Sequence, residues 1–73
     1  MAATRYLVVF EKMEHNWGAY SPDVPGCVAT GETMDEAQEN FREALEFHLD
    51  GLRRQGLPLP KPAAASGFVQ VEA

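Results

Sequence analysis

Hydrophobic and polar positions follow two different patterns along the chain, one typical of strands and one typical of a helix. The first half carries short apolar stretches rich in β-branched and aromatic residues, bounded by prolines, glycines and polar residues. Such stretches are typical of strands. They predict three strands, at about residues 5–12, 17–22 and 27–31, and the first two should form a hairpin.

A pattern with helical periodicity begins after Thr33. Thr33 is a good N-cap and Glu36 stands three residues later, which is the pattern of a capping box. Residues of one face then recur at helical spacing, at Ala37, Phe41, Ala44, Leu45, His48 and Leu52. Gly56 is a typical residue to end a helix. These signals predict a helix over about 34–55.

Prolines separate this helix from the last predicted element. Alternating prolines predict an extended, semi-rigid crossing over about 57–66. An apolar stretch after Gly67 predicts a final strand over about 67–72. The whole chain, residues 1–73, is therefore expected to form one α+β domain in the order β-β-β-α-β, with one helix packed on one face of a small sheet.

The balance of acidic and basic residues indicates which class of partner the protein could bind. Six Lys and Arg residues stand against eleven Asp and Glu residues, which gives a formal net charge of -5. A protein that binds nucleic acid usually shows a basic patch. Here the basic residues are scattered, so direct DNA binding is not expected. An acidic domain is better suited to a basic partner protein.

Size and cysteine content indicate how the domain is stabilised. A domain of 73 residues has a small core and often gains stability from a disulfide, a metal or another subunit. Cys27 is the only cysteine, so it cannot form a disulfide within the chain. The histidines and Cys27 lack the spacing of a zinc site, and we expect no metal and no cofactor. A homodimer or homotetramer is the remaining expectation.

The same features indicate a location. The apolar run near the N-terminus is too short for a signal peptide or a membrane span. A single free thiol fits a reducing compartment. We therefore expect a cytoplasmic protein without membrane association.

No catalytic group is predicted. A reactive cysteine needs a neighbouring base or a helix N-terminus, and Cys27 has neither in sequence, so we interpret it as a buried core residue. His48 falls on the apolar helix face and His15 in a turn, and neither has a nucleophile that the sequence places nearby. The chain is not expected to be an enzyme.

Several residues are candidates for binding a partner instead. A stripe of carboxylates runs along the predicted helix at spacings of three and four, at Glu36, Glu39, Glu43, Glu46 and Asp50. Such a stripe is either a solvated outer face or a docking surface for a basic partner. Trp17 and Tyr20 are either core residues or interface anchors. Asp23, between two prolines, is a charge that a partner could reach.

Phe47 lies on the flank between the apolar and the acidic helix faces. Either the proline-rich crossing or a second subunit could cover it. We expect the crossing, because its leucines and prolines need an apolar surface.

The turn-rich junction before the helix is the most specific motif in the chain. Pro-Asp-x-Pro-Gly-Cys, at 22–27, is followed by Gly-x-Thr-x-x-Glu-Ala, at 31–37. Together with Tyr6, Phe10-Glu11, Tyr20 and the Gly56…Pro58…Pro60 tail, this combination resembles the N-terminal domain of HicB-type antitoxins, over about residues 6–60.

The resemblance implies a domain similar to a trimmed ribonuclease H fold, without that enzyme's metal-binding acids. It also implies a role as the neutralising partner of a small basic, HicA-like toxin that cleaves mRNA. Family members usually continue into a C-terminal DNA-binding domain, whereas this sequence ends at Ala73. It is therefore expected to be a stand-alone member.

We thus expect a non-enzymatic, antitoxin-like protein that binds and masks a small basic mRNA-cleaving toxin. One alternative is a solitary protein-interaction or regulatory module with no cognate toxin. Another is an RNA-binding or nuclease module, which the acidic helix face disfavours because it would repel phosphates.

Overall fold

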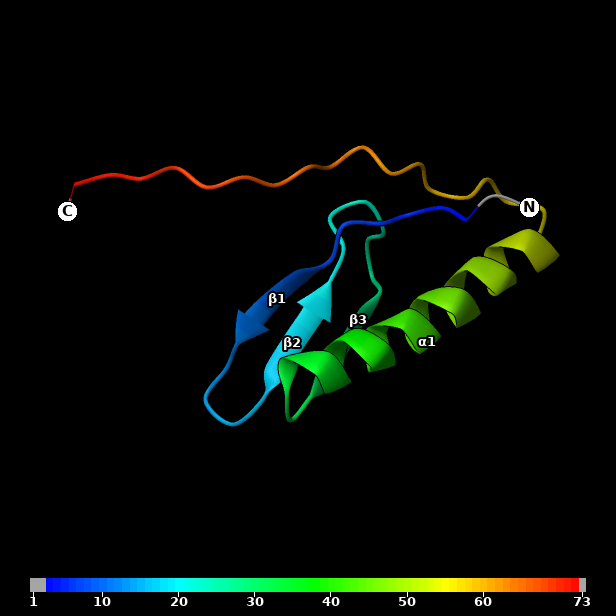
Figure 1. Cartoon of the computed structure of the whole chain (residues 1–73). Coiled ribbons are helices and arrows are strands. Elements are labelled where there is room, and N and C mark those ends of the chain that lie inside the picture. The colour runs from blue at the N-terminus through cyan, green and yellow to red at the C-terminus, as the bar shows by residue number, and fades with distance from the viewer. Residues whose placement is uncertain (1–2, 73) are drawn as a thin grey trace.

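Three antiparallel strands and one long helix form the body of the molecule (Figure 1). The computed structural model describes residues 3–72. The strands lie in the sheet in chain order, and the helix follows them. The elements are β1 (Val9–Lys12), β2 (Trp17–Tyr20), β3 (Val28–Gly31) and α1 (Met34–Arg54). The expected α+β class, with one helix packed on a small sheet, is confirmed.

The register of the strands gives the sheet two different faces. Phe10 lies opposite Ala19, which lies opposite Ala29, and this row packs against the core beneath α1. Because side chains alternate along a strand, the neighbouring row points the other way. That outer row consists of Val9, Tyr20 and Val28.

The core lies where α1 crosses β2 and β3. Phe41 and Ala37 are the buried residues of the helix, and Val24 reaches the same core from the loop after β2. Phe41 and Val24 are each 1% exposed. Gly31 brings the end of β3 against the helix backbone at Ala37, an approach that leaves no room for a side chain.

Both ends of α1 are capped as the sequence predicts. The Glu36 backbone N–H donates to Thr33 Oγ1 at 3.0 Å, and Glu36 Oε1 accepts from the Glu32 backbone N–H at 2.9 Å. This is a close variant of the capping box, with the returned bond one residue earlier. At the other end Gly56, at φ 70°, allows the Leu57 N–H to reach the Leu52 carbonyl at 2.9 Å.

The ladder is shorter than the sequence predicts. β1 begins at Val9 and not at about residue 5, because Val9 already pairs with the last residue of β2, Tyr20. Beyond Tyr20 the chain turns, with the Val24 N–H donating to the Ser21 carbonyl. Residues 5–8 therefore have no partner in β2.

The predicted final strand over 67–72 is wrong for this structure. Residues 57–72 form neither helix nor strand, although they run extended (Figure 1). The physical reason is pairing: a strand needs the edge of a neighbour, and this segment leaves the sheet without meeting one. We call residues 57–66 the crossing and residues 67–72 the arm.

Candidate partner-binding surface

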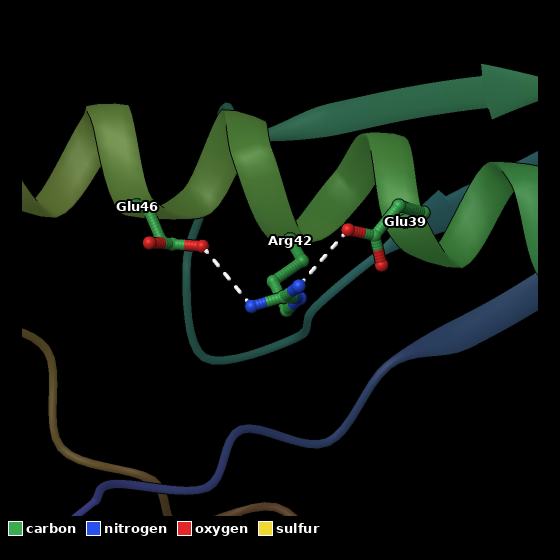
Figure 2. A network of polar contacts seen from close by, with 3 residues as sticks. All are labelled: Glu39, Arg42 and Glu46. Carbon is green, nitrogen blue, oxygen red and sulfur yellow. Dashed lines mark hydrogen bonds and ion pairs between the residues drawn. The ribbon is translucent and has the colours of Figure 1, made fainter.

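The acidic stripe of α1 is exposed, and part of its charge is balanced within the helix. Arg42 lies between two carboxylates, 2.9 Å from Glu39 Oε1 and 3.5 Å from Glu46 Oε1 (Figure 2). The hydrogen bond to Glu39, and the charges of both carboxylates, raise the pKa of Arg42 above its ordinary value. Exposed pairs of this kind contribute little to stability, so this triad mainly organises the surface charge.

Two further members of the stripe have partners. Glu36 belongs to the helix cap, and Asp50 Oδ2 lies 2.9 Å from Arg54 Nε. For Glu43, an exposed residue, no ion pair is seen within residues 3–72. Glu43 is therefore the carboxylate of the stripe whose charge is most available to a partner.

Phe47 stands one helical turn after Glu43 and is 83% exposed. The expectation that the crossing covers Phe47 is wrong. The crossing instead approaches the chain before β1, where the Tyr6 hydroxyl donates to the Pro60 carbonyl at 2.6 Å. Phe47 thus remains a large apolar side chain beside a free carboxylate.

A shallow groove lies next to Phe47, between α1 and the chain that enters β3. Its walls come from both elements, and include Cys27, Val28, Ala44, Phe47, His48 and Leu52. Val28 is 69% exposed. We call this region the acidic–aromatic surface; it consists of the groove together with Glu43, Phe47 and Val28.

The two aromatic residues of β2 lie on opposite faces of the sheet. Trp17 packs against the core, and the Lys12 ammonium lies 5.4 Å from the centre of its ring. Tyr20 lies on the outer face, in the row with Val9 and Val28, and is exposed. Of the two, Tyr20 is the one that a partner could contact directly.

Asp23 has a role within the chain. Its Oδ2 accepts hydrogen bonds from the backbone N–H groups of Ala63 and Ala64, at 3.1 and 3.0 Å. The Asp23 N–H in turn donates to Ser21 Oγ at 3.3 Å, within the turn after β2. The carboxylate proposed from sequence as a partner contact thus anchors the crossing to this turn.

Replacing Asp23 with alanine should release the crossing without unfolding the body. Hydrogen bonds to a charged acceptor contribute about 1.5–3 kcal/mol when buried, and less at a site partly open to water. We expect a loss of about 1 kcal/mol in unfolding free energy. Hydrogen exchange at the Ala63 and Ala64 amides should accelerate about tenfold or more.

Asp23→Asn is the matched control, since it keeps an acceptor oxygen but removes the charge, and it should give an intermediate acceleration. Unchanged exchange at both amides in Asp23→Ala would show that the carboxylate does not hold the crossing.

Cys27 and His48 both line the groove, but no hydrogen bond between their side chains is seen within residues 3–72. Cys27 is buried, and burial raises the pKa of its thiol, which disfavours the nucleophilic thiolate. His15 is exposed beside Glu14, and His48 lines the groove. Among residues 3–72, no group of three or more His, Cys, Asp or Glu side chains is placed to hold a metal ion. Over the same residues, no helix has the length and apolarity needed to cross a membrane.

Sequence reasoning identified the acidic stripe but not the whole surface. From the sequence, Val28 is predicted only to lie in a strand. The alternation of side chains along a strand does not reveal which face of the sheet another element covers, so the exposure of Val28 could not be predicted. The signal for Phe47 was present, because it falls outside the apolar stripe. Its exposure depends on the path of the crossing, ten or more residues later, which no local pattern gives.

Known proteins are similar to this chain in sequence and in fold. The family model described as HicB-like antitoxin of bacterial toxin–antitoxin systems matches residues 6–72. An uncharacterised 14.9 kDa protein of Haemophilus phage HP1 is 39% identical over 56 residues, which cover 77% of this chain and 42% of the phage protein. Antitoxin HicB 2 of Photorhabdus laumondii is 33% identical over 70 residues, covering 94% of this chain and 50% of that protein.

A solved structure titled HicA3 and HicB3 toxin–antitoxin complex contains a similar chain. The match has a TM-score of 0.69 and 32% sequence identity, and it covers 82% of this chain and 70% of the other. The chain spans half or less of the length of the phage protein and of Antitoxin HicB 2. The family match, in contrast, covers nearly all of its residues, and the chain therefore belongs to the HicB-like antitoxin family.

Proposed function

We propose that this protein is a non-enzymatic, cytoplasmic antitoxin that binds and masks a small basic, HicA-like toxin. The proposal is supported by the family and by the likeness to a chain from a toxin–antitoxin complex. The acidic–aromatic surface is the observation that suggests which residues would bind the toxin. An exposed phenyl ring, 83% accessible, stands there one turn from Glu43, whose carboxylate has no ion pair among residues 3–72.

Charge supports a basic partner. The stripe holds five carboxylates, and two guanidinium groups within the helix, those of Arg42 and Arg54, pair with some of them. The remaining negative charge would attract a basic protein at long range and accelerate encounter. The acidic–aromatic surface would compete with RNA phosphates for the basic groups of the toxin, which is how masking would act.

Phe47 would supply the affinity that exposed charges do not. Aromatic side chains that fill a pocket at the centre of an interface often account for about 2 kcal/mol or more of binding energy. Carboxylates at the edge of such an interface mainly set orientation and association rate. We therefore assign Phe47 as the anchor and Glu43 as the charged neighbour that selects a basic partner.

The test is binding and inhibition with a HicA-like toxin from the same genome. Phe47→Ala should weaken the complex about thirtyfold, mainly through faster dissociation. Glu43→Lys should slow association and reduce its dependence on salt. Both variants should allow mRNA cleavage at antitoxin concentrations at which the unmodified protein blocks it.

Glu14→Lys is the control for Glu43→Lys, because it makes the same charge reversal in the exposed hairpin turn. It should change association less than Glu43→Lys does. Normal inhibition by Phe47→Ala and Glu43→Lys would exclude this surface as the toxin site. Failure to bind any such toxin, with stoichiometric recovery of a different protein, would support a solitary interaction module instead.

A further inference from the structure

The arm has the composition of a buried strand but no cover. Phe68, Val69 and Val71 are 104%, 89% and 73% exposed. Figure 1 shows the arm running away from both the sheet and the helix to the C-terminal end of the described chain. Three large apolar side chains within four residues, all highly exposed, are unusual on a small monomeric domain, where extended apolar patches mark contact sites.

The arm leaves the body from a fixed point. The crossing is held first at Pro60 by the Tyr6 hydroxyl, and then at Ala63 and Ala64 by the Asp23 carboxylate. These bonds set the place from which the arm projects. The arm is therefore presented to the surroundings by ordered contacts just before it.

The sheet has one edge that matches the arm. β1 pairs only with β2, so within residues 3–72 its outer edge has no strand beside it. The other edge strand, β3, is crossed by α1, and the Asn40 side chain already donates to the Thr30 carbonyl at 2.8 Å. An open strand edge offers a row of unpaired backbone groups to another strand.

We propose that two copies of this chain exchange their arms, each arm adding a strand to the outer edge of β1 in the other copy. The six residues of the arm extend about 20 Å, enough to cover all of β1 and part of the chain before it. The contact is reciprocal, as two-fold symmetric dimers require. It would cover Val69, Val71 and the open edge in one step.

The alternation of the arm says which side chains enter the shared core. Val69 and Val71 lie on one face of an extended segment, while Phe68, Gln70 and Glu72 lie on the other. The valine face should turn toward the partner's core, and the face with Gln70 and Glu72 toward the outer side of the sheet. This assignment makes neighbouring positions suitable as test and control.

The experiment measures the mass of the 73-residue protein in solution across a dilution series by light scattering. The unmodified chain should be a dimer at micromolar concentration. Val69→Asp should raise the dimer dissociation constant about thirtyfold or more, because a charge replaces a buried methyl-bearing group. Gln70→Asp, which adds the same charge one residue away, should change it less than about threefold.

A mixture of isotope-labelled and unlabelled chains then identifies the contact. Magnetisation transfer between Val69 or Val71 methyls of one copy and β1 of the other would support the exchange. A monomer in which the arm contacts its own β1 would overturn the proposal, as would a dimer unaffected by Val69→Asp. The arm is exposed in the single chain, so circular dichroism should show that Val69→Asp keeps the helix. Toxin binding is measured separately, and its failure or success leaves this result unchanged.

Discussion

Replacing Gly31 with alanine should destabilise the protein more than any other single-methyl addition in the sheet. An added Cβ would contact the backbone nitrogen of Ala37 and lie 2.8 Å from the backbone carbonyl carbon of Glu36. Backbone atoms cannot rotate away as a flexible side chain can, so β3 and the start of α1 must separate. Overpacking of this kind costs about 3 kcal/mol, a large part of the roughly 5 kcal/mol expected of so small a domain.

Gly51→Ala is the matched control for this change. Gly51 lies within α1, and an added Cβ there has no atom within 4 Å. Alanine is the better helix former, so Gly51→Ala should stabilise the protein by about 0.5–1 kcal/mol. Urea denaturation of both variants gives the comparison. Equal stability of Gly31→Ala and the unmodified protein would show that the strand–helix contact is looser than described.

The second large effect is expected for Phe41→Ala. Phe41 is 1% exposed and is one of the two largest fully buried side chains among the described residues. Removing a buried phenyl ring costs about 3–5 kcal/mol, through lost apolar contacts and the cavity that remains. In a domain of this size that loss should leave a substantial unfolded population at room temperature, measurable by circular dichroism at 222 nm.

Phe47→Ala makes the same chemical change six residues along the same helix. Because Phe47 is exposed, its removal should alter the unfolding free energy by no more than about 0.5 kcal/mol. The same variant is the one expected to lose toxin affinity. A large loss of stability in Phe47→Ala would mean that the acidic–aromatic surface is structural, and would remove the basis for assigning it to a partner.

The elements that were predictable from sequence are those with local causes. The helix runs from Met34 to Arg54, within a residue of its expected range, because a cap at Thr33 and a left-handed glycine at Gly56 are set by near neighbours. The charged stripe follows from the same periodicity. Neither needs knowledge of how distant parts of the chain meet.

The features that could not be predicted depend on contacts between distant residues. Asp23 looks like an accessible charge until its carboxylate is seen to bind amides 40 and 41 residues later. Phe47 looks covered until the crossing is seen to pass Tyr6 instead. The arm has a strand pattern, but a pattern states only what a segment prefers, and pairing also requires that the segment lie against the edge of another strand.

The bonds that hold the crossing have a consequence for the order of folding. Tyr6 and Pro60 are 54 residues apart, whereas the strands and the helix are built from much closer contacts. Contacts between distant residues require closure of a long loop and tend to form late. The hairpin, β3 and α1 can therefore assemble first, and the crossing then docks across them. In local unfolding of the native state, the crossing is then the unit that opens at the lowest free energy. Its opening exposes the chain before β1 while the rest of the fold persists.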